Sequence, residues 1–118
     1  MSHLVSIKTQ IRDLAALQAA CTRLNLEQPK LGDHTLFGSK QEGYGVQLPG
    51  WKFLLVCDLA SGNVFYDNFN GSWGKQAELD RFQQAYAVCK VAIECRKKGQ
   101  NVVEALQADG SIRLTIAA

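Results

Sequence analysis

A long helical pattern near the carboxyl end of the sequence limits the folds that this chain can adopt. Apolar side chains recur there at intervals of three, four, three and four residues, at Leu79, Phe82, Tyr86, Cys89 and Ile93. This spacing places them on one face of an amphipathic helix. Gly99 suits the position after the last helical turn. We therefore expect a helix over residues 75–98 that buries one face against another layer.

A shorter helix is expected near the amino end. Leu14, Leu17, Cys21 and Leu24 follow one another at intervals of three, four and three residues. Asp13 is a suitable N-cap, because its carboxylate can accept from the free amides of the first turn. The helix should end within residues 25–27, before Pro29.

The remaining segments are typical of strands. A first strand is expected around Leu4 and Ile7. Four more should lie at residues 36–37, 44–48, 51–58 and 63–67, with turns at 41–43, 49–50 and 61–63. Segment 51–58 is nearly all apolar, which is typical of a strand buried on both faces. Strands joined by such short links predict an antiparallel meander.

The sequence ends in a predicted hairpin. Residues 101–107 and 111–116 flank Ala108-Asp109-Gly110, and Asp-Gly between two strand patterns is a strong turn signal. The full order is β-α-β-β-β-β-α-β-β. It predicts one α+β domain over residues 1–118, with two helices packed on one face of a mainly antiparallel sheet. The last strand, ending at Ala118, would be an edge through which a homo-oligomer could form.

Charge and composition disfavour several classes of function. The chain has 118 residues, a formal net charge of +2 and 20% charged residues. This charge is too small to favour nucleic acid or an anionic membrane. The longest apolar run, residues 53–57, is far shorter than a membrane-spanning helix requires. The first residues do not resemble a secretory signal, so we expect a cytoplasmic protein without a membrane partner.

The cysteines do not form a metal-binding motif. Cys21, Cys57, Cys89 and Cys95 contain no Cys-x-x-Cys pair. We expect the first three to be buried as small apolar side chains and Cys95 to be the most exposed thiol. His3 and His34 have no ligand partners at suitable spacing, so neither a metal nor a cofactor is predicted.

The segment from Tyr66 to Gly74 is the best candidate for a binding site. Tyr66, Trp73 and the neighbouring Trp51 offer contact area, and Asp67 and Asn68 offer directional hydrogen bonds. The segment joins a strand to the long helix, where binding groups are often presented. The alternative is purely structural: the polar residues cap a turn, and Trp73 packs into the core.

A second candidate lies in the first strand and the link that follows it. Lys8 and Arg12 could hold an anion or form a polar edge for a partner; the alternative is a solvated strand edge. Lys90 and residues 96–98 form a small basic cluster, which keeps a nucleic-acid-binding module as an alternative. No nucleophile motif is present, and Asp58 and Asp67 are typical turn formers, so no catalytic residue is predicted.

Five segments carry a family resemblance in the same order along the chain. They are residues 2–13, 66–74, 79–88, 96–99 and 109–112. Together they resemble the domain-of-unknown-function family twelve fifty-seven, which includes the hypothetical chloroplast reading frame thirty-five proteins. The centre, Tyr-Asp-Asn-Phe-Asn-Gly-Ser-Trp-Gly, is more similar to the bacterial branch of that family.

The resemblance implies an accessory role. Genes of the family often lie beside a small companion protein and an AAA-type ATPase, so it implies a protein partner of that kind. Two alternatives stay open. One is a ligand-binding protein or enzyme with a pocket beside the 66–74 segment, and the other is the nucleic-acid-binding module.

Overall fold

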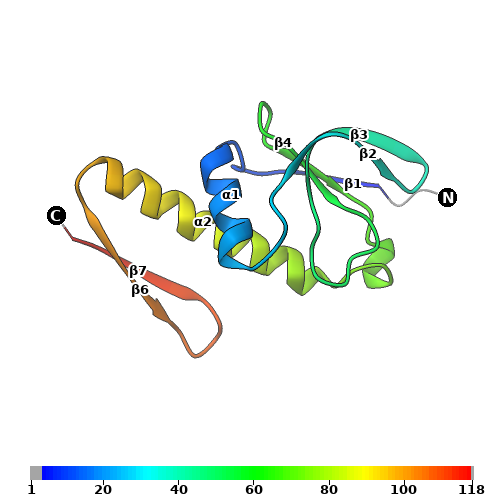
Figure 1. Ribbon diagram of the computed structural model, residues 1–118. Coiled ribbons are helices and arrows are strands. Elements are labelled where there is room, and N and C mark those ends of the chain that lie inside the picture. Colours follow the sequence, from blue (N-terminus) through cyan, green and yellow to red (C-terminus); the bar gives the residue numbers. More distant parts are fainter. Residues whose placement is uncertain (1–3, 118) are drawn as a thin grey trace.

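A five-stranded antiparallel sheet forms the main layer of the computed structural model, which describes residues 4–117 (Figure 1). Its strands are β1 (Val5–Lys8), β2 (Lys30–Leu36), β3 (Ser39–Val46), β4 (Leu55–Asp58) and β5 (Asn63–Tyr66). Their spatial order is β1-β5-β4-β3-β2. Strands β2 to β5 thus follow one another as the predicted antiparallel meander, and β1 pairs beside β5.

The expected turn at residues 41–43 is wrong, because these residues lie inside β3. The turn is instead Phe37-Gly38, between Leu36 and Ser39. Glycine is typical of turns, but Gly43 lies within the strand, where the backbone of β4 approaches closely. A Cβ at Gly43 would lie only 2.6 Å from the carbonyl oxygen of Cys57 on β4. A glycine is therefore required where two strand backbones approach closely.

The predicted strand at 51–58 is correct only in its second half. Residues 51–54 form an irregular segment that enters β4 at Leu55. Leu55, Val56 and Cys57 are fully buried, as expected for a central strand. The first half leaves the sheet because Trp51 turns into the core, where its indole N–H donates to the carbonyl oxygen of Lys75 at 3.1 Å.

Both predicted helices are present. They are α1 (Leu14–Arg23) and α2 (Gln76–Lys97). Asp13 caps α1 by accepting from the amides of Ala15 and Ala16. Its other carboxylate oxygen accepts from Lys90 Nζ on α2 at 2.8 Å, and this hydrogen bond lowers the pKa of Asp13. The cap therefore also connects the two helices.

The core lies where the two helices pack against each other and against the sheet. Leu17 and Cys21 of α1 meet Phe82 and Ala85 of α2 over the inward side chains of the sheet. The phenol oxygen of Tyr86 accepts from the amides of Arg12 and Asp13, at 3.1 and 3.0 Å. The buried tyrosine thus satisfies the amides at the entrance to α1. This arrangement confirms the α+β class.

The C-terminal hairpin forms a sheet of its own. Strands β6 (Asn101–Leu106) and β7 (Ile112–Ala117) pair only with each other among residues 4–117. They stand away from the main sheet at the far end of α2 (Figure 1). The hairpin itself was predicted, but its separation from the main sheet was not. Ala118, named above as the end of the edge strand, and His3 lie outside the described residues.

No helix in the described part of the chain is long and apolar enough to cross a membrane.

Candidate interaction surface

The segment after β5 turns most of its predicted binding residues inward. Tyr66, Asp67 and Asn68 are buried. Asp67 Oδ1 accepts from the amide of Phe69 at 3.2 Å. The carbonyl oxygen of Asn68 accepts from the amides of Gly71 and Trp73, at 3.0 and 2.9 Å. These residues fix the shape of the loop, as in the structural alternative given above.

Trp51 and Tyr66 belong to the core. Their rings meet edge to face, with centroids 5.6 Å apart. A Cβ at Gly74 would lie 2.5 Å from the Trp51 ring, so the indole packs directly against the backbone at the start of α2. Both residues hold the 66–74 segment against the sheet, and neither presents a ring to solvent.

Trp73 is the one predicted aromatic that reaches the surface, and it is the centre of an aromatic cluster. Phe37, Phe53 and Phe69 surround it, with centroids 5.3, 5.5 and 4.7 Å from the Trp73 ring. Phe37 is 42% exposed and Phe69 is 37% exposed, whereas Phe53 and Trp73 are half-buried. We call these four residues and Lys52 the aromatic cluster.

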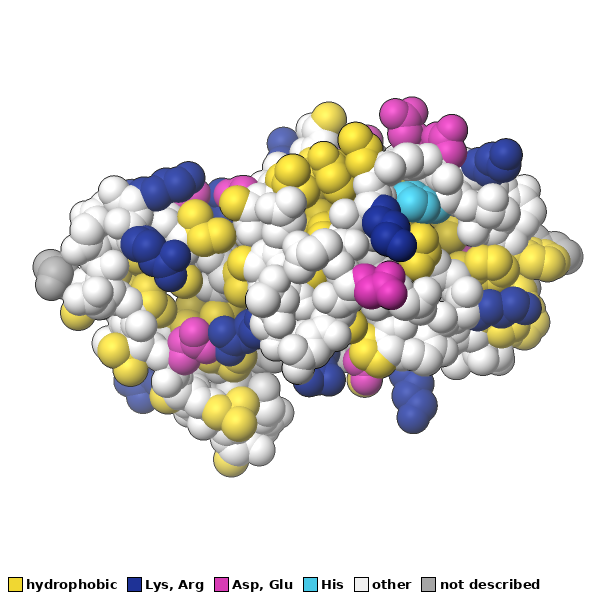
Figure 2. Space-filling model, in the orientation of Figure 1, with side chains coloured by type: hydrophobic (Ala, Val, Ile, Leu, Met, Phe, Trp, Pro, Cys, Tyr) yellow, Lys and Arg dark blue, Asp and Glu magenta, His cyan; other side chains and the backbone are white. Residues whose placement is uncertain are grey.

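Lys52 completes the aromatic cluster. Its ammonium lies 4.6 Å from the centroid of Trp73 and 5.6 Å from that of Phe53. Its amide donates to the carbonyl oxygen of Trp73 at 2.8 Å, which joins the two loops. In Figure 2, hydrophobic side chains gather beside basic ones at the end of the molecule opposite the hairpin. The cluster is therefore an apolar surface with a positive charge within it.

The backbone under Phe69 is strained. Phe69 and Asn70 have φ values of 46° and 52°, in the left-handed region. Asparagine tolerates this region, but a bulky residue there is an outlier. The strain allows Phe69 to stack on Trp73, at an interplanar angle of 26°. Strain of this kind often marks a functional position, because packing alone would favour a relaxed residue.

Sequence reasoning missed Phe37, Phe53 and Lys52 as members of the site, and it did not name Phe69 as a contact residue although Phe69 lies in the 66–74 segment. One signal was available for Phe37. A two-residue link of the form X-Gly between strands is a hairpin turn, and that interpretation would have placed Phe37 at an exposed tip. Phe53 and Lys52 gave no such signal, because they lie in a segment that reads as a buried strand.

Lys8 and Arg12 do not join the aromatic cluster. Lys8 pairs with Asn63 at the start of β5, whereas Tyr66 at its end pairs with Val5. The two ends are roughly 10 Å apart along the strand. The side chains of Lys8 and Arg12 are exposed, and Arg12 Nη2 donates to the carbonyl oxygen of Ser61 at 3.0 Å. The structure therefore presents two separate candidate surfaces.

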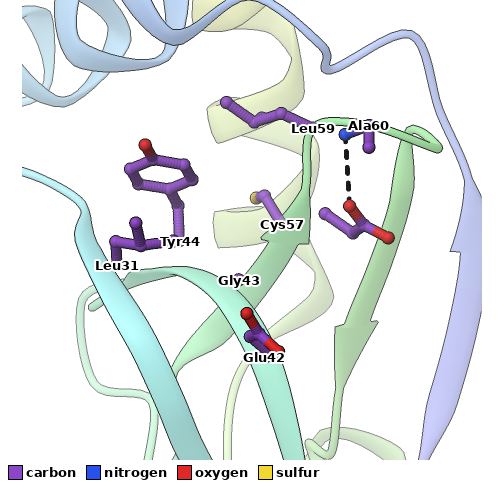
Figure 3. A pocket seen from close by; sticks show the side chains of 8 residues that line it. Leu31, Glu42, Gly43, Tyr44, Cys57, Leu59 and Ala60 are labelled. Carbon is purple, nitrogen blue, oxygen red and sulfur yellow. Dashed lines mark hydrogen bonds between the residues drawn. The ribbon is translucent and has the colours of Figure 1, made fainter.

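A small depression lies beside the β3–β4 pair. It has a volume of about 360 Å³, and Tyr44, Cys57 and Leu59 surround it (Figure 3). At its rim, Asp58 Oδ1 accepts from the amide of Ala60 at 3.1 Å. Burial raises the pKa of Cys57 to about 12. A thiol with this pKa is protonated at neutral pH, so Cys57 would be a poor nucleophile for a ligand bound there.

The thiols differ from expectation at two positions. Cys21 and Cys57 are buried, as predicted, whereas Cys89, which was also expected to be buried, is partly exposed. The expectation for Cys95 is wrong, because this residue is also buried. The chain turns back after α2, where the amide of Gln100 donates to the carbonyl oxygen of Cys95 at 2.8 Å. The returning hairpin thereby packs on this end of the helix.

We expect the native protein to show two classes of thiol in a reaction with a disulfide reagent at pH 8. Burial raises the pKa of Cys21 to about 11 and that of Cys57 to about 12. Their thiolate fractions should make them react at least about a hundredfold more slowly than an exposed cysteine. Cys89 should react first. Fast reaction of Cys57 in the folded protein would contradict the described packing.

The described residues contain no group of three or more His, Cys, Asp or Glu side chains that could hold a metal ion.

The comparisons with known proteins give one relative. The chain is 28% identical to the uncharacterized protein ycf35 of Pyropia yezoensis over 130 aligned residues. The alignment covers 98% of this chain and 96% of that protein. No protein-family model matches, and no solved structure matches. This similarity over nearly the full length supports a relationship between the chain and the ycf35-like proteins.

Proposed function

We propose that this protein is an accessory protein without catalytic activity and that it binds a protein partner through the aromatic cluster. The observation that carries the proposal is the stack of the exposed Phe69 on the half-buried Trp73, held by a strained backbone. Aromatic side chains at the centre of an apolar patch are typical anchors of protein interfaces.

The chemistry of the aromatic cluster favours a particular kind of partner surface. The four rings offer apolar area, and the ammonium of Lys52 lies over two of them. A partner segment with an apolar side chain next to a carboxylate would match both features. Free bases or sugars would match less well, because Phe69 and Lys52 already cover the Trp73 ring.

The buried residues of the 66–74 segment have a supporting role in this proposal. Asp67 and Asn68 hold the loop from within, and Trp51 and Tyr66 anchor it to the core. Trp73 is retained from the predicted site as a contact residue. Lys8 and Arg12, at the other end of β5, would serve a separate polar contact.

The family resemblance suggests which protein binds to the aromatic cluster. It implies an AAA-type ATPase and a small companion protein, encoded beside members of the family. We propose one of these two proteins as the partner of the aromatic cluster and the cytoplasm as the place where they meet.

Substitution of Phe69 separates binding from folding. We expect Phe69→Asn to reduce partner capture at least about tenfold, because it removes an anchor ring. The variant should keep its stability within about 1 kcal/mol. The lost stacking contributes about 0.5–1.5 kcal/mol, and asparagine tolerates the left-handed backbone at a lower cost than phenylalanine.

The measurement is affinity capture of the tagged protein from its native lysate, quantified by mass spectrometry, with a thermal melt of each variant. Leu31→Ala is the matched control, since Leu31 is 67% exposed but lies outside the aromatic cluster. The proposal predicts an ATPase or small companion that wild type and control retain and Phe69→Asn loses. Equal capture by all three proteins would reject it. Salt-dependent retention of nucleic acid instead would favour the alternative module.

A further inference from the structure

We propose that the protein forms a dimer in which β7 pairs with β7 of a second copy, giving a four-stranded antiparallel sheet. This inference is independent of the aromatic cluster, which lies at the opposite end of the molecule. It begins from the hairpin's small number of contacts with the rest of the chain.

The hairpin is attached to the body at few points. Arg23 of α1 forms a two-pronged ion pair with Glu104 of β6. Gln84 of α2 donates to the carbonyl oxygen of Gly110 at 3.1 Å. Between these contacts a groove of about 880 Å³ separates the hairpin from the helices, and both hydrophobic and charged side chains line it (Figure 2). A two-stranded sheet held in this way is marginally stable without further pairing.

One face of the hairpin is almost entirely apolar. The register pairs Val102 with Ile116 and Leu106 with Ile112, and it places Leu114 opposite Glu104. These six residues share a face, because directly opposed residues point to the same side and the side alternates along each strand. Leu106 is 78% exposed and Ile116 is 51% exposed. The apolar face therefore extends beyond the area that the helices cover.

The free edge of β7 offers its backbone groups at the apolar positions. The amide of Gln107 donates to the carbonyl oxygen of Ser111 at 2.8 Å, so this pair is hydrogen-bonded across the hairpin. Hydrogen-bonded and non-hydrogen-bonded pairs alternate in antiparallel strands. The N–H and C=O groups of Ile112, Leu114 and Ile116 therefore point away from β6, toward the open edge.

This edge is complementary to itself. If Leu114 lies opposite Leu114 of the second copy, Ile112 of each copy lies opposite Ile116 of the other. The outward backbone groups then face one another as hydrogen-bonded pairs, and the apolar faces join on one side. On the other side, Arg113 lies opposite Thr115, so no like charges meet.

The edge of β6 does not have this property. In the corresponding register, Glu104 would lie directly opposite Glu104 of the second copy. Like charges directly opposed across strands are destabilising. Each Glu104 would also have to keep its ion pair with Arg23 while lying in the interface between the two β6 strands. Because the β7 edge pairs with itself without opposing like charges and the β6 edge does not, we expect β7 to be paired with β7 of a second copy of this chain.

Sedimentation of the full chain over a range of concentrations tests the pairing. We expect a species of about 26 kDa, twice the 13.0 kDa of one chain. Leu114→Lys should abolish it, since two ammonium groups would meet at the symmetry axis. Leu106→Lys is the matched control, on the same apolar face but on β6, and should still dimerise. Circular dichroism shows whether each variant is folded.

A second pair of variants tests the register without disturbing the hairpin, because Thr115 is exposed. Thr115→Glu would face Arg113 of the other copy and should tighten the dimer, whereas Thr115→Arg should weaken it. Two symmetry-related pairs should shift the dissociation constant roughly two- to thirtyfold in each direction. A monomer at all concentrations, a dimer unaffected by Leu114→Lys, or the same response to both charges at position 115 would overturn the proposal.

Discussion

Trp51→Ala is expected to lower the free energy of unfolding by about 3–5 kcal/mol. The indole is 4% exposed, packs edge to face on Tyr66 and lies against the backbone of Gly74. Its removal leaves a cavity that the rigid start of α2 cannot close, and the carbonyl oxygen of Lys75 loses its donor. Urea unfolding followed by circular dichroism measures the change.

Phe37→Ala is the control for that experiment. Phe37 also contacts a tryptophan, but it lies at an exposed turn. Its replacement by alanine should therefore lower the free energy of unfolding by less than about 1.5 kcal/mol. If both variants lost the same stability, Trp51 would not be the core anchor described above. A large difference would confirm that Trp51 anchors the core, whereas Phe37 lies at the surface and contributes little to folding.

Gly62→Ala is expected to destabilise the protein by about 2–4 kcal/mol. Gly62 has a φ of 81°, and a Cβ there would lie 2.3 Å from the carbonyl oxygen of Thr9. The two residues are joined by hydrogen bonds from the amide and hydroxyl of Thr9 to the carbonyl oxygen of Gly62, both at 2.8 Å. The added methyl group would separate the exit of β1 from the turn before β5.

Gly110→Ala separates the cost of the left-handed backbone from the cost of the close approach to Thr9. Gly110 has a similar φ of 88°, but a Cβ there would have no neighbouring atom within 4 Å. The free energy of unfolding of the Gly110→Ala variant should therefore fall by only the roughly 1–2 kcal/mol that a left-handed backbone costs an L-residue. Chemical denaturation of both variants gives the comparison. Equal losses would mean that the close approach of Thr9 contributes nothing.

Helices and the final hairpin are predictable from this sequence because local signals determine them. The apolar stripe and Gly99 predicted α2 to within one residue at each end. The sheet is less predictable, because a glycine inside a strand reads as a turn. Gly43 lies in β3 for a reason that exists only in three dimensions, namely the neighbouring carbonyl oxygen of Cys57.

The 66–74 segment could be singled out from its composition, but which of its side chains face solvent could not be predicted. Tyr66 and Asp67 point inward, whereas Phe69 points outward. That division depends on the left-handed backbone at Phe69 and Asn70 and on ring contacts with two other loops. Neither can be read from spacing. The burial of Cys95 likewise depends on the hairpin that returns over α2.

Site-specific photo-cross-linking shows whether the aromatic cluster contacts a partner protein. A photoreactive phenylalanine analogue at position 37, within the cluster, is compared with the same analogue at position 31, which is exposed but outside it. We expect a discrete cross-linked partner from position 37, none from position 31, and loss of the product in the Phe69→Asn variant. The same product from both positions, or none from position 37, would contradict the proposed contact.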